Sequence, residues 1–329
     1  MSGMISLSCI VRFLKKWTLP VSMAIGALGY FLVSGLGIGP AGRNFILTII
    51  SYVQPMLLFC MLFLTFCKVK ASDMRFCHWQ LWMLLFQSLL FVALACLDIA
   101  IGESGWNVVT ESMMLCFICP TATAAAVVTG KLGGNAGSLT LYTVMINLCT
   151  SLLVPLMVPL VHPAATHGFV QSFALIIGKV FPLLICPLLL AMALRRIVPS
   201  MVARLTSCRD LAFYLWAVSL ALAIAVTTRS IVHGGVPLAY EAAIAAASLL
   251  ACIVQFAFGR WIGRRYGEPI SAAQSCGQKN TVLAIWMGYT FMSPITAIAG
   301  GFYSIWHNVW NSWQLASPSS VTTRPVKRA

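Results

Sequence analysis

The sequence predicts an all-α polytopic membrane protein. We expect about ten transmembrane helices in two inverted five-helix repeats, with crossed broken helices at the fourth and ninth positions. The 329 residues are 60% hydrophobic and only 9% charged, whereas a soluble domain carries about a quarter charged residues. Apolar runs of about 20 residues, long enough to span a bilayer, follow one another along the chain. Two of these runs, roughly half a chain apart, are interrupted by helix-breaking and polar residues.

Charged residues, glycines and prolines bound the expected spans. Each span is an apolar run between such boundaries. The seventh and ninth runs are shorter than the others. In chain order the expected spans are Trp17–Leu36, Phe45–Phe66, Trp79–Ala100, Val108–Val128, Leu139–Val161, Phe169–Leu194, Leu211–Val226, Leu238–Phe258, Ile270–Met287 and Pro294–Trp313.

Lysine and arginine residues give the orientation, because cytoplasmic loops carry an excess of them. With the N-terminus in the cytoplasm, the outer connections contain only Arg43 and Arg229, and Lys179 and Lys279 fall within the membrane. The remainder of the 21 basic residues fall on the inner side. We therefore expect a multi-pass protein of the plasma (inner) membrane with both termini cytoplasmic. The same distribution explains the +14 net charge without a nucleic-acid partner, since the basic residues are dispersed over loops.

This topology divides the chain into four parts. Residues 1–16 form a cytoplasmic N-terminus, residues 17–161 the first five-helix repeat and residues 169–315 the second. Residues 316–329, rich in Ser, Thr and Pro, are expected to be a disordered cytoplasmic tail. Because five is an odd number of crossings, the second repeat enters the membrane from the opposite side.

The two interrupted spans indicate a binding site. The fourth span reads CPTAT over residues 119–123, and the ninth reads SCGQKN over residues 275–280. In hydrocarbon, every backbone N–H and C=O needs a partner, so unwound backbone persists only where it is buried in protein or lines a cavity. Two interruptions at corresponding positions of two halves predict the midplane binding site of a secondary transporter.

Enzyme classes lack their motifs in this chain. The sequence contains no H-E-x-x-H, no G-x-S-x-G and no P-loop, so we expect no catalytic residues, no bound metal and no cofactor. None of the 12 cysteines falls in an expected outer loop. They are predicted to be small apolar packing residues without disulfides.

Two stretches resemble motifs of the bile acid:sodium symporter family. Residues 119–129 (CPTATAAAVVT), followed by GGN at 133–135, are similar to its fourth-helix motif. Residues 277–281 (GQKNT), with Pro294 and Tyr303 downstream, are similar to its ninth-helix motif and tenth helix. The number and spacing of the spans extend the resemblance over essentially the whole chain.

The resemblance implies a fold of ten helices in two domains. Spans one, two, six and seven would form a panel, and the other six a core in which the broken helices cross. Substrate would bind between panel and core and be carried by an elevator-like rocking motion. Members of this family typically move organic anions such as bile acids, with sodium driving uptake.

The departures from the family pattern bear on sodium. The resemblance implies side-chain oxygen ligands at several positions, and most of these have changed. In this chain they fall on Ala125 and Ala126 in the fourth span, Leu139 and Thr143 in the fifth, and Ser275 and Lys279 in the ninth, with Gln87 retained in the third. Because alanine and leucine offer no side-chain oxygen, we expect this chain not to use sodium as the family does. Lys279, Gln87, Thr143 and Ser275 remain candidates for ion coupling or for holding a structural cation.

Lys279 has three open interpretations within the membrane, and a fourth in which a misplaced span boundary puts it at the surface. A lysine near the bilayer midplane costs a few kcal/mol or more, so such residues are generally functional. Its ammonium could be a built-in cation, held by unwound carbonyls and helix C-termini, that stabilises the crossing. It could instead be a proton-coupling group, because burial lowers a lysine's pKa. It could also pair directly with an anionic substrate.

Five residues are candidates for substrate binding. Thr121, Thr123, Gln278 and Asn280 flank the two breaks, where unwound backbone and helix N-termini offer donors to an anion. The two threonines are alternatively donors to freed backbone groups. Lys179 in the sixth span either faces the substrate cleft or snorkels elsewhere. His307 and Asn308 in the last span are expected to be interhelical hydrogen-bond partners, with a proton-carrying role as the alternative for His307.

The predicted function is secondary active transport of a small organic anion by alternating access, with that anion and the lipid bilayer as partners. The alternatives are a proton-coupled or uncoupled carrier of another inverted-repeat family, and a channel or non-transporting membrane sensor. A cation/proton antiporter generally needs intramembrane carboxylates. All seven acidic residues, however, are expected near span ends or in loops: Asp73, Asp98, Glu103, Glu111, Asp210, Glu241 and Glu268.

Overall fold

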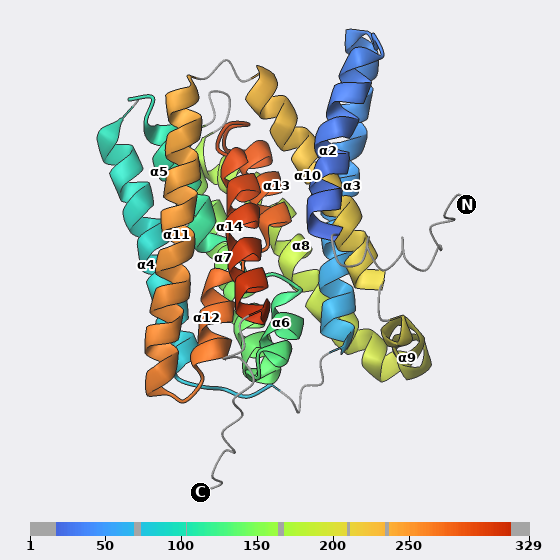
Figure 1. The fold of residues 1–329 in the computed structure, drawn as a ribbon, viewed down its shortest axis with the longest axis vertical. Helices are drawn as coiled ribbons and strands as arrows, with labels where there is room; N and C mark the ends of the chain where they lie inside the picture. Colours follow the sequence, from blue (N-terminus) through green and yellow to red (C-terminus); the bar gives the residue numbers. More distant parts are fainter. Residues whose placement is uncertain are drawn as a thin grey trace, which may run out of the picture.

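The chain folds into helices that cross the molecule side by side (Figure 1). The computed structural model describes residues 18–68, 74–102, 104–163, 168–208, 211–233 and 237–316. Within these residues it contains 13 helices, of which six are long and apolar enough to cross a membrane. The protein is therefore a multi-pass membrane protein.

The helices divide into long and short elements. The longer ones are α2 (Thr18–Gly35), α3 (Pro40–Lys68), α4 (Trp79–Ile101), α7 (Ala136–Val161), α8 (Phe169–Ile197), α10 (Leu211–His233), α11 (Leu238–Arg265) and α14 (Ile298–Ala316). The shorter ones are α5 (Asn107–Ile118), α6 (Ala125–Lys131), α9 (Pro199–Ser207), α12 (Pro269–Gly277) and α13 (Thr281–Phe291).

The two predicted interruptions are confirmed. The expected fourth span is divided into α5 and α6 by residues 119–124, and the expected ninth span into α12 and α13 by residues 278–280. Pro120 lies in the first break, where its missing N–H removes a helix hydrogen bond. Proline alone does not end a helix in this chain, since α7 continues through Pro155 and α8 through Pro182. The predicted N-terminal segment 1–16 lies outside the described residues. Of the predicted tail 316–329, only Ala316 is described, as the last residue of α14.

Several boundaries differ from the sequence prediction, and local hydrogen bonds accompany two of these differences. Helix α10 runs seven residues past the expected end at Val226, to His233, because hydroxyls such as those of Thr227 and Thr228 bond to carbonyls of their own helix. Helix α14 begins at Ile298 rather than Pro294. Ahead of it, Ser293 and Thr296 bond to each other in a turn. The short helix α9 was not predicted.

The helices pack in two groups. Helix α10 packs against α2 and α3, and α3 packs against α8, so these four are called here the four-helix group. Helix α8 also packs closely against α7, which joins this group to the remaining helices. Helices α4–α7 and α11–α14 form a second, larger set, which contains both interrupted helices and is called here the broken-helix group. In Figure 1 the two groups lie side by side, with α2 and α3 at the right edge.

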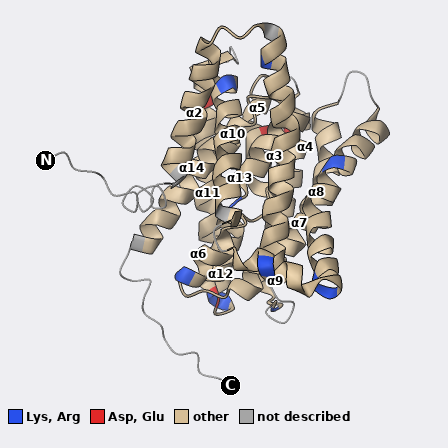
Figure 2. Ribbon diagram, turned by 90° about the vertical axis from the view of Figure 1, so that its right-hand side faces the viewer, with Lys and Arg blue, Asp and Glu red and all other residues tan. Residues whose placement is uncertain are grey.

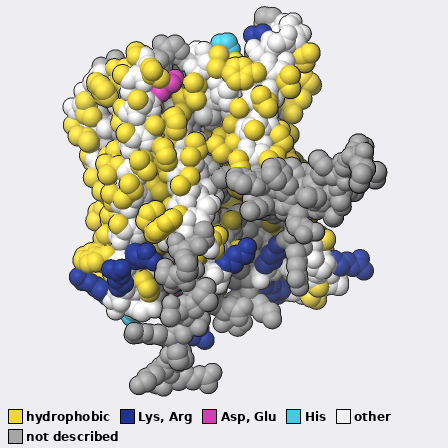
Figure 3. All heavy atoms as spheres, viewed as in Figure 1, with side chains coloured by type: hydrophobic (Ala, Val, Ile, Leu, Met, Phe, Trp, Pro, Cys, Tyr) yellow, Lys and Arg dark blue, Asp and Glu magenta, His cyan; other side chains and the backbone are white. Residues whose placement is uncertain are grey.

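Basic residues gather at one end of the molecule. The last turns of α3, α6, α8 and α11 carry Lys68, Lys131, Arg195 and Arg264 respectively. This placement is favourable because a helix C-terminus carries partial negative charge. Figure 2 shows lysines and arginines at the end of the molecule that holds α6, α9 and α12, and Figure 3 shows the same band of charge below an apolar surface. We call this the basic end.

Close glycine contacts hold α12 against α11. A Cβ atom at Gly259 would lie 2.6 Å from the carbonyl oxygen of Ala272, and one at Gly263 would lie 2.6 Å from that of Glu268. These glycines are four residues apart, the small-xxx-small spacing that lets membrane helices approach closely. Helix α11 is thereby the support on which one half of the second broken helix rests.

We predict that Gly259→Ala destabilises the protein, because the new methyl group must push α12 away. Gly178→Ala in α8 is the matched control, since a Cβ there meets nothing within 4 Å. In a helix this control should be neutral or stabilising, by about 0.5–1 kcal/mol. Thermal unfolding of the purified proteins in detergent measures both. Equal melting temperatures for the two variants would contradict this account of the α11–α12 contact.

Candidate functional site

The two unwound segments pair with each other in the interior of the broken-helix group. Thr121 and Lys279 form an isolated antiparallel bridge. The amide of Ala122 donates to the carbonyl of Gln278, and the amide of Asn280 donates to the carbonyl of Pro120, both at 2.8 Å. We call the place where residues 119–124 and 278–280 meet the crossing. Backbone groups that have no partner within their own helix are hydrogen-bonded there to the other segment, as an apolar environment requires.

Protein donors occupy every carbonyl in the last turn of α12. These four oxygens would otherwise be orphaned at the helix end. The carbonyl of Gln274 accepts from the Gln278 amide (3.0 Å), that of Ser275 from Thr121 Oγ1 (2.7 Å), that of Cys276 from Gln87 Nε2 (3.2 Å) and that of Gly277 from the Tyr303 hydroxyl (2.8 Å).

The last turn of α5 is closed in the same way. Here, too, each of the four terminal carbonyls has a donor. The carbonyl of Leu115 accepts from the Cys119 amide (3.1 Å), that of Cys116 from Gln255 Nε2 (3.1 Å), that of Phe117 from Lys279 Nζ (3.0 Å) and that of Ile118 from Thr150 Oγ1 (2.8 Å).

Lys279 is the basic residue at this crossing. Its side chain is 2% exposed, and Nζ donates to the carbonyl of Phe117 in the last turn of α5. Two helices, α5 and α12, end beside it, and each helix C-terminus carries about half a negative charge. This geometry favours the interpretation of Lys279 as a built-in cation that stabilises the crossing.

A buried polar network joins the crossing to neighbouring helices. Gln87 accepts a hydrogen bond from the Tyr142 hydroxyl at 2.6 Å and donates to Gln255 at 3.0 Å. Gln255 in turn donates to the Tyr303 hydroxyl at 3.0 Å. Side chains from α4, α7, α11 and α14 therefore hold the end of α12 in place. Gln255 was not predicted from the sequence, because Gln87 was identified only through the family resemblance. A glutamine inside an apolar span is the signal that could have indicated Gln255.

A cavity of about 570 Å³ lies against the crossing, between the two helix groups. The four-helix group contributes Thr65 and Lys68 from α3 and Trp216 from α10. The broken-helix group contributes α6, the unwound segments and α14. Because Lys68 ends α3 and Lys131 ends α6, the cavity extends from the crossing to the basic end.

The lining of this cavity is cationic and polar. Lys68, Lys131 and Lys279 all line it, and its described lining residues include no aspartate or glutamate. Gln278 and His307 are among the lining residues. Oε1 of Gln278 and Nδ1 of His307 are buried, and neither atom has a hydrogen-bond partner in the described residues. This chemistry suits an anion that also carries hydrogen-bonding groups.

Three of the five predicted substrate residues line this cavity: Thr123, Gln278 and Asn280. Asn280 also caps α13, accepting a hydrogen bond from the Leu283 amide at 3.3 Å. Thr121 is 1% exposed, and its hydroxyl serves the crossing rather than the cavity. Lys179 is exposed on α8, outside the cavity lining, with Nζ 5.9 Å from the ring centroid of Phe291.

The residues at the expected sodium positions form no set of free oxygen ligands. Ala125 and Leu139 are fully buried and apolar. The hydroxyl of Thr143 donates to the carbonyl of Leu139 in its own helix. Only Ser275 presents a buried hydroxyl without a partner in the described residues, and Gln87 is engaged as described above. Across the described residues, no group of three or more His, Cys, Asp or Glu side chains could hold a metal ion.

The acidic side chains that the structure describes lie away from the crossing or are engaged elsewhere. Glu111, near the start of α5, accepts from the Thr296 hydroxyl at 2.6 Å and lies 2.5 Å from His162 Nε2. Glu268, just ahead of α12, accepts from Trp79 Nε1 at 3.2 Å and from Ser138. Asp98 accepts from Thr110, and Asp73, Glu103 and Asp210 lie outside the described residues.

Several cavity residues were not predicted from the sequence as a site. Lys68, Lys131 and Trp216 come from three helices far apart in the chain, so only the packing brings them together. His307 and Asn308 were expected to form interhelical hydrogen bonds. Instead Asn308 donates to Ser304 of its own helix, and His307 Nδ1 is unpartnered in the described residues.

Comparison with known proteins gives a family match. Residues 68–319 match the SBF-like CPA transporter family (DUF4137). The matched range begins at the end of α3 and includes both broken helices and the cavity. No curated protein shows a significant match.

We predict that Lys279→Gln destabilises the protein by about 1–3 kcal/mol, the usual cost of leaving a buried polar group unpaired. Glutamine does not reach as far and carries no charge for the two helix C-termini. Lys179→Gln is the matched control, because that lysine is exposed and loses only a long contact with the Phe291 ring. Thermal unfolding separates the two variants. If the Lys279→Gln protein were as stable as the control, Lys279 would not be a residue that stabilises the crossing.

We further predict a pH-dependent contact between His162 and Glu111. Their hydrogen bond raises the pKa of His162 above its usual 6.5. Because this histidine pKa is raised in the folded protein, the stabilisation is fully present below about pH 6.5 and is lost as pH rises through the raised value. It amounts to at most about 1 kcal/mol, since the histidine is 36% exposed and solvent screens the pair.

The measurement is melting temperature against pH for wild type and His162→Gln. The difference between the two proteins should be largest at acid pH and shrink towards alkaline pH. A difference that grows with rising pH would contradict the assignment.

Proposed function

Because the chain belongs to the SBF-like CPA transporter family, we propose that it is a secondary active transporter of a small organic anion. The observation that carries this proposal is the cavity at the crossing. Three lysines line it, and its described lining contains no carboxylate. A cation substrate would find no counter-charge there, so cation/proton antiport is disfavoured.

The substrate is proposed to bind where the cavity meets the crossing. Thr123, Gln278 and Asn280 supply polar groups, and α13 directs its N-terminus, with its partial positive charge, towards the same place. Trp216 on the opposite wall offers an apolar surface to the organic part of the anion. The anion would thus be held between the four-helix group and the broken-helix group.

Transport is proposed to proceed by alternating access, with the two groups moving relative to each other. The antiparallel pairing of the two broken helices supports an arrangement of ten crossings in two inverted repeats. The basic end is proposed to face the cytoplasm, in keeping with the excess of lysine and arginine there. The structure would then represent a state in which the cavity extends inward.

Coupling is proposed to differ from the sodium coupling of bile acid:sodium symporters. Two observations support this. The last-turn carbonyls of α5 and α12 already have protein donors, and Lys279 supplies the positive charge there. A second cation beside Lys279 would be repelled, at a cost of about 4 kcal/mol for charges 4 Å apart at an effective dielectric constant of 20.

The first test is uptake into proteoliposomes containing the purified protein. Candidate anions are a bile acid and small mono- and dicarboxylates, each supplied with sodium or with choline at constant ionic strength. We expect saturable uptake of at least one anion at a rate that sodium does not change. Uptake of a cation with no uptake of any anion would contradict the proposed substrate class, and a steep rise with sodium would contradict the proposed coupling.

The second test is Thr123→Ala, which removes a hydroxyl from the cavity wall. We expect KM for the transported anion to rise by about fivefold, the equivalent of one hydrogen bond of about 1 kcal/mol. Thr228→Ala is the control, since that hydroxyl bonds within α10, to the carbonyl of Ile224. The amount of folded protein should match in both variants. An unchanged KM in Thr123→Ala would place the substrate elsewhere.

A further inference from the structure

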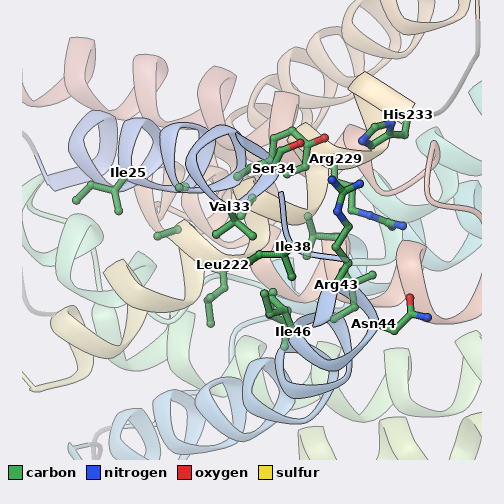
Figure 4. A pocket seen from close by; sticks show the side chains of 18 residues that line it. Ile25, Val33, Ser34, Ile38, Arg43, Asn44, Ile46, Leu222, Arg229 and His233 are labelled. Carbon is green, nitrogen blue, oxygen red and sulfur yellow. The ribbon is translucent and has the colours of Figure 1, made fainter. Parts of the chain in front are cut away.

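A second cavity lies within the four-helix group, at the end opposite the basic end. It has a volume of about 710 Å³ and is lined by α2, α3 and α10 (Figure 4). None of its lining residues belongs to the cavity at the crossing. The proposed transport site therefore does not account for it.

The mouth of this cavity is basic. Arg43 near the start of α3, and Arg229 and His233 near the end of α10, all line it. In Figure 4 the two arginine side chains reach into the same end of the cavity. Neither arginine forms an ion pair within the described residues. Arginines on the outer side of a membrane protein are uncommon, and here the two expected outer arginines meet at one place.

The remainder of the cavity is apolar. Ile25 and Val33 of α2, Ile46 of α3 and Leu222 of α10 line its walls. The glycine at position 29 leaves room, because a Cβ atom there would meet nothing within 4 Å. On the outside of the same helices, large side chains such as Phe31 and Tyr52 are exposed, as expected for a surface that faces lipid.

We propose that this cavity binds one anionic phospholipid of the membrane leaflet at that end. The phosphate would lie between Arg43 and Arg229, because the planar guanidinium matches phosphate oxygens in a bidentate manner. An acyl chain would lie along the aliphatic walls between α2, α3 and α10. A small water-soluble anion would leave those walls uncovered, which is why the occupant is a lipid.

This lipid would bind α3 to α10 at the end where the two helices carry like charges. A phosphate between two guanidiniums replaces their repulsion with attraction on both sides. The four-helix group would thus be fastened to the bilayer while the broken-helix group moves. The lipid site does not depend on the proposed transport function.

The test is native mass spectrometry of the purified full chain in detergent, titrated with dioleoylphosphatidylglycerol or dioleoylphosphatidylcholine. Wild type should retain one phosphatidylglycerol, and retain it more strongly than phosphatidylcholine. Arg43→Gln with Arg229→Gln should weaken phosphatidylglycerol binding by about tenfold or more, as expected for lost charge-assisted hydrogen bonds. The control is Arg196→Gln with Arg204→Gln, which removes the same charge from exposed positions at the basic end.

Gly29→Leu is a second, independent variant, because it fills the apolar part without removing a charge. It should lower phosphatidylglycerol retention while leaving the melting temperature of the lipid-free protein unchanged. The proposal is overturned if the control pair loses as much lipid as Arg43→Gln with Arg229→Gln, or if inorganic phosphate alone stabilises wild type as strongly as the lipid. It is also overturned if either cavity variant dissociates a dimer without changing lipid retention, since a second copy of the chain would then cover this face.

Discussion

The carbonyl oxygens at the ends of two half-helices are the constraint on which the rest of the structure depends. Where α5 and α12 stop inside an apolar medium, each leaves four carbonyls that water does not reach. Backbone amides satisfy one at each end, and side chains satisfy the others: Thr121, Gln87, Tyr303, Gln255, Lys279 and Thr150. These donors come from helices that must therefore pack around the crossing. The broken-helix group is assembled around this requirement.

The need for partners at these carbonyl oxygens also bears on how transport could be coupled to an ion. In a transporter that uses sodium, free carbonyls and side-chain oxygens at such helix ends can serve as ligands for a hard cation. Here a lysine ammonium occupies that role at α5, and the neighbouring side chains at the expected ligand positions are largely apolar or engaged. In the proposed coupling, Lys279 supplies the positive charge that a transported ion would otherwise bring. The described lining of the cavity beside it includes three lysines and no carboxylate, which is why an anion is the proposed substrate.

The two helix breaks could be predicted from the sequence, because they depend on local chemistry. The composition of the cavity could not, because it depends on tertiary packing. Pro120 lacks an N–H for the helix ladder, and polar residues follow Cys276 inside an apolar run, so the sequence indicated both interruptions to within about three residues. The end of α10 was missed, because its hydroxyls satisfy themselves within the helix. Lys68 and Lys131 reach the cavity from separate helix ends, and only the packing reveals it. Thr121 looked like a substrate residue, yet its hydroxyl has a backbone carbonyl as its partner.

The most direct measurement of the central claim is a pair of high-resolution density maps, one in sodium chloride and one in choline chloride. The account predicts the same crossing in both maps, with the Lys279 ammonium on the carbonyl of Phe117 and with side-chain donors on the ends of α5 and α12. Density for an ion at those carbonyls in sodium alone, with Lys279 displaced from Phe117, would contradict it.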